Sequence, residues 1–109
     1  MTIALPTPLA ACFTADRAGD VEAFLDLFTE HAVVVDERRT YTGRDEIRAW
    51  KAGAAAQYSY TAEPFAIAAQ DGQTIVTAHL SGNFPGSPVD LRYGFTLQDS
   101  RIERLEIAP

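Results

Sequence analysis

Few residues of this 109-residue sequence have the type and spacing of a recognised chemical site. Cys12 is the single cysteine, which excludes an intrachain disulfide and a metal site built from four thiolates. The two histidines, His31 and His79, stand at no recognised metal-ligand spacing from the carboxylates. No glycine-rich loop has the form that binds phosphate. We therefore predict neither a metal ion nor a cofactor.

The charged residues are mostly acidic. The formal net charge of -6 argues against binding to a phosphate backbone, so nucleic acid is not an expected partner. Four basic residues nevertheless cluster: Arg38, Arg39, Arg44 and Arg48. They could bind an anionic ligand or the carboxylates of a partner, but a solvated loop and helix face is the simpler interpretation.

No apolar stretch approaches the roughly 18 residues that a membrane-spanning helix requires. The N-terminal residues also lack a basic segment followed by a long apolar run, as a secretory leader would have. With a single cysteine, the sequence suits a reducing compartment, so we expect a cytoplasmic protein that does not bind membranes.

The first half of the chain predicts helices. Apolar residues at helical spacing follow Pro6, and Gly19 is a natural end for this first helix. Asp20 can cap a short second helix whose apolar stripe extends to Phe28. A third helix, with Ile47, Trp50 and Ala54 on one face, is expected to end near residue 57. The stripes of the first two helices consist of Leu5, Leu9, Cys12, Phe13, Val21, Phe24, Leu25 and Phe28.

The remaining segments predict strands. Residues 32–35 are short and β-branched, and a polar turn is expected over residues 37–43. From residue 58 onward the apolar period is two, with turn signals that separate four strands. Pro64 predicts a bulge or an edge strand, and Gly82 and Gly94 suit sharp bending or close backbone approach. The run 82–88 is interpreted as a rigid hairpin connection, with a lid over a pocket as the alternative.

This order of elements predicts an α+β fold in which a cone-shaped, curved antiparallel or mixed sheet wraps around the N-terminal helices. His79 alternates with apolar residues of its strand and is expected on the outer face of the sheet. Tyr58 and Tyr60, together with that outer face, could form a dimer contact. We expect a homodimer through the outer face of the sheet.

Several short stretches, in this order and spacing, carry a resemblance to a known family. They are 18–20 (Ala-Gly-Asp), 27–28 (Leu-Phe) followed by 32–36, and 42–43 (Thr-Gly) followed by 47–50. Together they resemble the nuclear-transport-factor-type cone fold, which includes the ketosteroid isomerases and the SnoaL-type polyketide cyclases. The resemblance implies one cystatin-like domain over residues 1–109.

The resemblance implies a role for Asp36, which falls where the ketosteroid isomerases carry the aspartate that abstracts a proton beside a carbonyl. A carboxylate at the mouth of an apolar pocket has a raised pKa and can exchange protons near neutral pH. The alternative is that Asp36 caps a turn or pairs with Arg38 or Arg39.

The rest of the isomerase site is matched poorly. Cys12 stands where those enzymes have a tyrosine donor, and a thiol is a weak donor. The position of their second, protonated aspartate falls at Tyr93 or Arg92. Tyr93 shares the parity of its inward neighbours and could donate to a developing oxyanion, or it is an ordinary core tyrosine.

Two functions remain open. One is isomerase, cyclase or hydrolase chemistry on a small apolar carbonyl compound, with Asp36 and Tyr93 as catalytic residues. The other is a non-catalytic ligand-binding or dimerisation module. In either case aromatic and apolar side chains are expected to line a ligand pocket. These ligand-binding candidates are Cys12, Phe13, Phe28, Tyr41, Trp50, Tyr58 and Phe95.

Overall fold

The computed structural model describes residues 3–109 as three helices and six strands. The helices are α1 (Thr7–Ala18), α2 (Val21–Leu25) and α3 (Gly43–Gln57). The strands are β1 (Phe28–Asp36), β2 (Arg39–Thr42), β3 (Tyr60–Gln70), β4 (Gln73–Gly82), β5 (Val89–Gln98) and β6 (Arg101–Ala108). Residues 1 and 2, the start of the segment considered above for a leader, lie outside the described residues.

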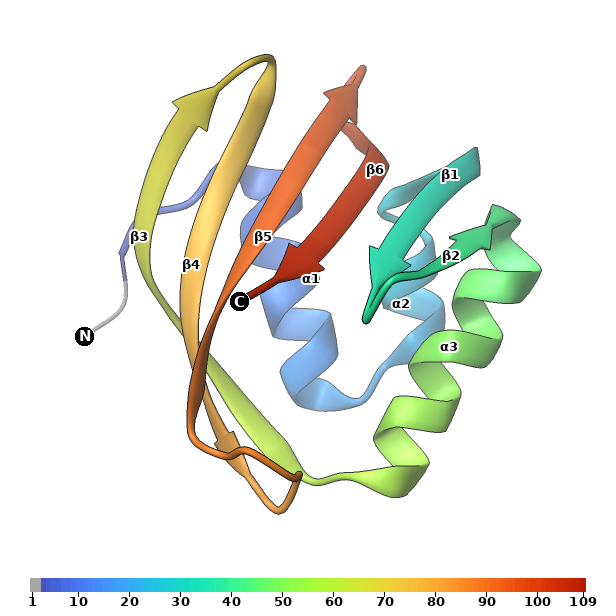
Figure 1. Ribbon diagram of the computed structural model, residues 1–109. Coiled ribbons are helices and arrows are strands. Elements are labelled where there is room, and N and C mark those ends of the chain that lie inside the picture. The colour runs from blue at the N-terminus through green and yellow to red at the C-terminus, as the bar shows by residue number, and fades with distance from the viewer. Residues whose placement is uncertain (1–2) are drawn as a thin grey trace.

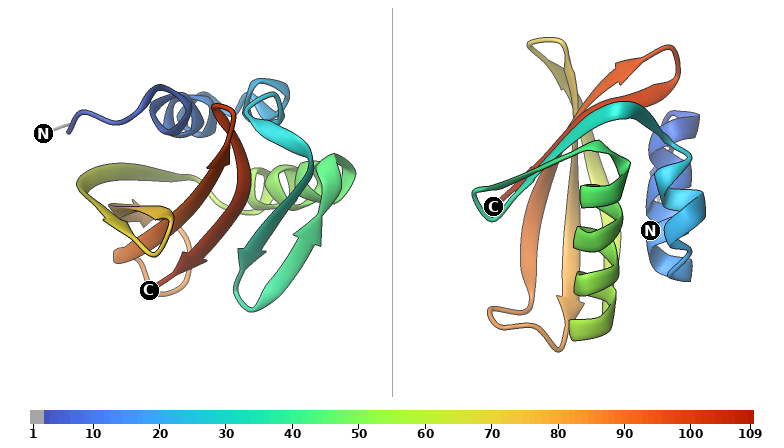
Figure 2. Two further views of the ribbon diagram at one scale, coloured as in Figure 1. Left: turned by 90° about the horizontal axis from the view of Figure 1, so that it is seen from above. Right: turned by 90° about the vertical axis from the view of Figure 1, so that its right-hand side faces the viewer.

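The six strands form one mixed sheet in the order β2-β1-β6-β5-β4-β3. The pair β1–β6 is parallel and all other neighbouring pairs are antiparallel. The sheet curves strongly, and the three helices lie on the side toward which it curves (Figures 1 and 2). The predicted α+β class, with a curved mixed sheet around the helices, is confirmed.

The helix ends follow the expected local chemistry. Pro6 precedes the first turn of α1, and Gly19 ends that helix with a left-handed φ of 69°. The Asp20 carboxylate accepts a hydrogen bond of 3.1 Å from the Ala23 amide and so caps α2. The turn between α1 and α2 is therefore determined by two adjacent residues, and it forms one rim of the cavity described below.

Two predicted elements were wrong. Phe28 is not on the second helix, because α2 ends at Leu25 and Phe28 begins β1 in register with Ile102 of β6. Residues 37–43 do not form only a turn, because β2 pairs antiparallel with β1 through a tight hairpin. Glu37 and Arg38 both have positive φ (51° and 66°), the conformation of the two-residue hairpin turn that glycine and asparagine usually signal.

The strand features that were predicted to bend the sheet are present. β3 is an edge strand and has a register shift between Pro64 and Ala66, so both expectations for Pro64 are met. Gly82 lies where a Cβ atom would come within 2.2 Å of the Ser59 carbonyl oxygen. Close backbone approach therefore requires glycine at this position.

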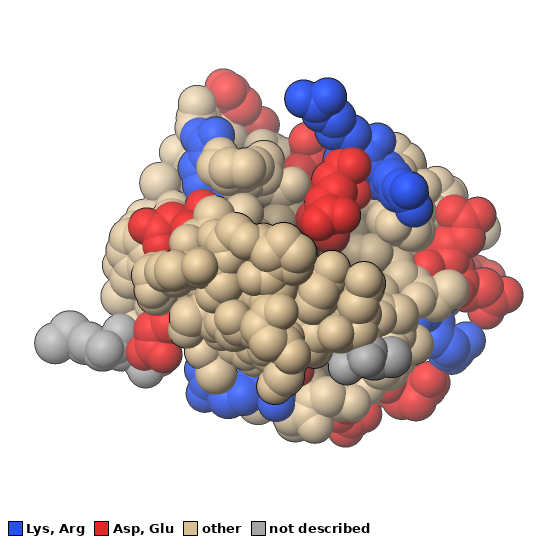
Figure 3. All heavy atoms as spheres, turned by 60° about the horizontal axis from the view of Figure 1, so that its bottom comes forward, with Lys and Arg blue, Asp and Glu red and all other residues tan. Residues whose placement is uncertain are grey.

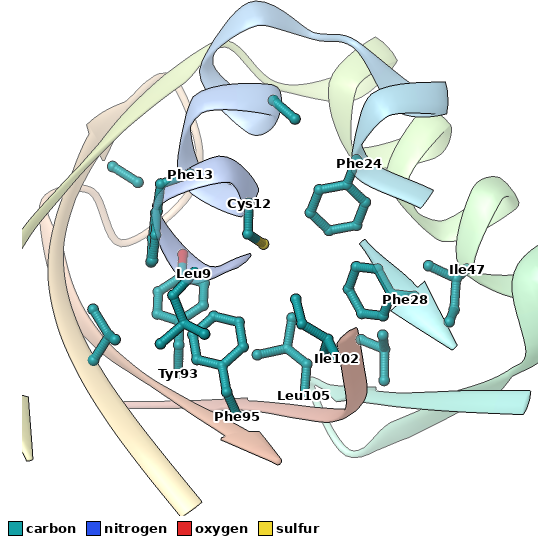
Figure 4. Close-up of a cluster of buried hydrophobic side chains, with 14 of the residues drawn as sticks. Leu9, Cys12, Phe13, Phe24, Phe28, Ile47, Tyr93, Phe95, Ile102 and Leu105 are labelled. Atoms are coloured by element: carbon teal, nitrogen blue, oxygen red, sulfur yellow. The ribbon is translucent and has the colours of Figure 1, made fainter. Parts of the chain in front are cut away.

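The core lies between the helices and the concave face of the sheet (Figure 4). Its largest fully buried side chains come from α1, α3 and four strands, so one apolar cluster joins both layers. They are Leu9, Phe28, Val34, Ile47, Val76, Phe95, Ile102 and Leu105.

His79 is exposed on the outer face of the sheet, as predicted, and its Nδ1 lies 2.7 Å from an oxygen of Asp90 on the neighbouring strand. Seen with the lower end of Figure 1 turned forward, charged side chains of both signs surround a broad uncharged area (Figure 3). Dimerisation through the outer face stays a prediction. Within residues 3–109, no helix is long and apolar enough to cross a membrane.

Candidate functional site

Asp36 lies at the inward-facing end of β1. It has the same parity as Val34, which is fully buried in the core, so its carboxylate points toward the inside of the cone. The indole Nε1 of Trp50, on α3, donates a hydrogen bond of 3.0 Å to Asp36 Oδ2. Asp36 is therefore half-buried, and among residues 3–109 it forms no ion pair with Arg38 or Arg39.

The pKa of Asp36 is raised above the usual value of an aspartate. Partial burial is the main cause, because it disfavours the charged form. The hydrogen bond from Trp50 opposes this effect, and the positive charge of Lys51 acts in the same direction as Trp50. A carboxylate with a raised pKa is a stronger base than an ordinary aspartate, as general-base proton transfer requires.

The sheet register places Tyr93 in line with Asp36. Asp36 is paired with Ile107 of β6, which is paired with Tyr93 of β5. Two strand spacings, about 10 Å, therefore separate the two backbone positions, and both side chains lie on the concave face. Arg92 is exposed and donates to the Pro109 carbonyl, so Tyr93 and not Arg92 faces the interior.

Tyr93 is 9% exposed, and its ring packs edge-on against Phe13 with centroids 5.0 Å apart. Figure 4 shows its hydroxyl directed into the core toward α1. Burial raises the pKa of this hydroxyl well above 10, so Tyr93 stays protonated and can act as a hydrogen-bond donor.

Cys12 is buried on α1 in the same interior. Burial raises the pKa of its thiol to about 12, against the attraction of Lys51, so the thiol stays neutral. It is thus a small apolar wall residue with weak donor capacity.

The other predicted ligand-binding residues lie in three environments. Phe13, Phe28 and Phe95 are packed into the core. Tyr41 and Trp50 are partly buried and contact each other, with ring centroids 5.9 Å apart. Tyr58 lines a cavity of about 270 Å³ at the ends of α1 and α3.

A polar cluster that the sequence interpretation missed borders this cavity. Lys51 on α3 forms an ion pair with Asp16 on α1, and its Nζ donates a hydrogen bond of 3.3 Å to the Tyr60 hydroxyl. Tyr60 in turn donates to Asp16 Oδ1 at 3.0 Å. Tyr60 therefore points inward, and its suggested role at an outer dimer contact was wrong. We call Asp16, Lys51 and Tyr60 the polar triad.

The polar triad is largely withdrawn from solvent. The side chains of Lys51 and Asp16 are 11% and 14% exposed. Lys51 Nζ also lies 4.7 Å from the ring centroid of Phe24 and 5.2 Å from that of Trp50. Burial by itself lowers the pKa of Lys51, but Asp16 and Tyr60 outweigh it and the pKa is raised, so the ammonium stays charged.

Helical spacing could have identified the triad. Asp16 follows Cys12 by four residues and Lys51 follows Ile47 by four, so each charged residue continues the inward stripe of its helix. Opposite charges at the ends of two inward stripes indicate an internal pair. The cavity itself is lined by residues 15–21, Lys51 and residues 58–60.

No group of three or more histidine, cysteine, aspartate or glutamate side chains suited to a metal ion occurs among the described residues. The chemistry available to this part of the chain is that of two carboxylates, an indole, two phenols and an ammonium group, suited to proton transfer and hydrogen bonding.

Comparison with known proteins gave a family and a set of structural neighbours. The family model described as a SnoaL-like domain matches residues 9–105. A Sinorhizobium meliloti protein with a provisional polyketide cyclase assignment is 41% identical, with a TM-score of 0.91 and 95% of each chain covered. No match was found among curated proteins.

Two more distant structures show the same fold. One is a Catenulispora acidiphila protein with a ketosteroid isomerase-like fold in complex with trimethylamine: 19% identity, TM-score 0.84, covering 97% of this chain and 87% of that one. The other is SalBIII, an epoxide hydrolase/cyclase-like enzyme with a role in pyran ring formation in salinomycin: 21% identity, TM-score 0.78, covering 94% and 86%.

Proposed function

Because this chain belongs to the SnoaL-like family, we propose that it catalyses cofactor-independent proton transfer on a small apolar carbonyl compound, with Asp36 as the acid–base group. The family and its cyclase- and isomerase-like neighbours support a cyclase or isomerase role. The observation that carries the finer proposal is the half-buried Asp36 carboxylate, directed inward and held by the Trp50 indole.

In the proposed step, Asp36 takes a proton from the carbon beside the carbonyl, and the electron pair of that C–H bond moves to give an enolate. Asp36 then returns the proton to the same or a different carbon, which gives exchange or isomerisation. Tyr93, protonated and directed into the core, supplies a hydrogen bond to the enolate oxygen.

Trp50 is a positioning residue in this proposal. Its indole N–H fixes one carboxylate oxygen and lowers the pKa of Asp36 relative to burial alone. Replacement by phenylalanine removes the donor and leaves an aromatic ring. We expect Trp50→Phe to move the pH dependence of the reaction upward as well as to reduce its rate.

A non-catalytic binding module is the second candidate. It is favoured by the packing of Phe13, Tyr93 and Phe95, whose rings lie 5.0 to 6.3 Å apart and occupy space that a substrate would need. This alternative predicts ligand binding without any Asp36-dependent exchange of protons.

The experiment that separates the two measures deuterium incorporation beside the carbonyl of 2-tetralone, an apolar enolisable ketone, by NMR in D2O. We expect the wild-type protein to accelerate exchange and Asp36→Asn to reduce this acceleration by about 100-fold or more, the lower range for a general base. Asp99→Asn is the matched control, because it makes the same chemical change in an exposed turn whose φ of 50° suits asparagine. Equal acceleration by wild type and Asp36→Asn would contradict the proposal.

A further inference from the structure

Lys51 is the only lysine in the sequence, and the other basic residues are all arginine. Lysine is almost never buried unless it is paired, and here the whole residue is 9% exposed and paired within the polar triad. A buried ion pair contributes little net stability compared with apolar residues of the same shape. Its position at the wall of a cavity, not in the sealed core, suggests a second use.

The hydrogen bonds of the polar triad leave one donor and one acceptor unassigned. An ammonium group has three N–H donors, and among the described residues Lys51 directs them to two partners, Asp16 and Tyr60. Asp16 is contacted by both Lys51 and Tyr60, and both contacts are made at its Oδ1 atom. Asp16 Oδ2 has no hydrogen-bond partner within the described part of the chain.

We propose that this cavity is a ligand subsite in which Lys51 donates to a carbonyl oxygen and Asp16 accepts from a hydroxyl group of the same molecule. The charged groups of an ion pair lie within about 4 Å of each other. A hydroxyl on the carbon next to the carbonyl can span this separation, so the ligand class we propose is a small α-hydroxy-carbonyl compound. The Tyr60 hydroxyl keeps the two charged groups in this arrangement.

The charges of the cavity favour a neutral ligand. Arg17 and Asp20 also line it, so its two positive and two negative side chains balance. Its volume of about 270 Å³ lies just below the range of about 300–1,000 Å³ for pockets that hold drug-sized molecules, and it suits a single substituted ring. Recognition here does not require reaction at Asp36, so the inference goes beyond the proposed function.

The test uses methyl mandelate as the probe, because this ester carries a hydroxyl next to its carbonyl. Methyl 2-methoxy-2-phenylacetate and methyl phenylacetate are matched probes that lack the hydroxyl donor. In protein labelled with ¹³C-lysine, Lys51 gives the only side-chain lysine signals, which report binding directly. We expect saturable shifts with methyl mandelate in the millimolar range and at least tenfold weaker binding of both matched probes.

Ala18→Trp places a large side chain at the exposed end of α1, in the wall of the cavity, without altering the polar triad. We expect it to abolish binding and to leave the melting temperature unchanged. Ala49→Trp, an exposed position of α3 outside the cavity lining, is the control that keeps binding. Tyr60→Phe keeps the ion pair and should weaken binding by several fold.

Three outcomes would overturn the inference: no saturable Lys51 shift with methyl mandelate, equal binding of the three probes, or binding that survives Ala18→Trp. The inference and the proposed function fail separately. Asp36→Asn is expected to bind methyl mandelate as the wild type does, so loss of exchange with intact probe binding bears only on Asp36.

Discussion

Replacing Lys51 by methionine tests whether the polar triad is a buried electrostatic unit. Methionine keeps most of the volume of the lysine stem and its contacts with Phe24 and Trp50, but it removes the ammonium group. Asp16, whose side chain is 14% exposed, is then left without its ion-pair partner.

The expected loss in the free energy of unfolding follows from the burial of Asp16. Breaking a buried pair by removing one partner typically costs about 3–5 kcal/mol. An unfolding entropy of about 2.1 cal/mol/K per residue gives roughly 0.23 kcal/mol/K for a chain of this length, so a loss of 3 kcal/mol lowers the melting temperature by about 13 °C. Asp16→Asn combined with Lys51→Met leaves no unpaired charge and should recover a large part of the loss.

Urea denaturation at pH 7, followed by far-UV circular dichroism, measures both variants. Arg48→Met is the matched control: it lies on the same helix and pairs with Glu22 of α2 at 3.0 Å, but the two side chains are 46% and 71% exposed. We expect Arg48→Met to lower the free energy of unfolding by only a small fraction of the loss in Lys51→Met, because solvent screens exposed ion pairs.

Equal losses for Lys51→Met and Arg48→Met would refute the reasoning from burial. The reasoning would also be refuted if the double variant lost as much stability as Lys51→Met and Asp16→Asn lose when measured singly and added, since Asp16 and Lys51 would then not interact.

Three further predictions concern stability and reactivity. Asp36→Asn should raise stability at neutral pH. The raised pKa of Asp36 favours folding below its unfolded pKa of about 3.9, and this contribution is lost as the pH rises through the folded pKa. Urea melts should therefore show a gap in stability between variant and wild type at pH 7 that narrows as the pH falls and closes below about 3.9. Cys12, with a thiol pKa of about 12, should react with Ellman's reagent at pH 8 roughly a thousandfold more slowly in the native protein than in urea, and a native rate equal to the denatured one would contradict its burial. Gly82→Ala should cost about 1–3 kcal/mol or more because its Cβ meets the Ser59 carbonyl, whereas Gly53→Ala, in open space on α3, should gain about 0.5–1 kcal/mol; chemical denaturation of the pair tests this contrast.

The sequence was sufficient for the fold because its local signals agree with one another. Gly19 and Asp20 specify the turn between α1 and α2, and the change of apolar period after residue 57 separates α3 from the four strands that follow it. Phe28 was assigned to the wrong element because its spacing continues the helical stripe, whereas pairing with Ile102 of β6 is a long-range contact that spacing does not reveal.

The candidate site was predicted only in part. Asp36 and Tyr93 were identified by resemblance and parity, and the register through β6 explains why they share a face. The polar triad was missed because Asp16 and Lys51 are common surface residue types, and only the packing of α1 against α3 and β3 brings them together with Tyr60.

The most direct test of acid–base catalysis by Asp36 compares two titrations of the same group. The pH dependence of 2-tetralone exchange gives a kinetic pKa, and the ¹³Cγ signal of Asp36 in labelled protein gives its pKa by NMR. We predict that the two agree, lie above the usual aspartate value, and move upward together in Trp50→Phe, because the indole donor lowers the pKa of Asp36. A kinetic pKa that stays in place while the Asp36 signal moves would show that another group transfers the proton.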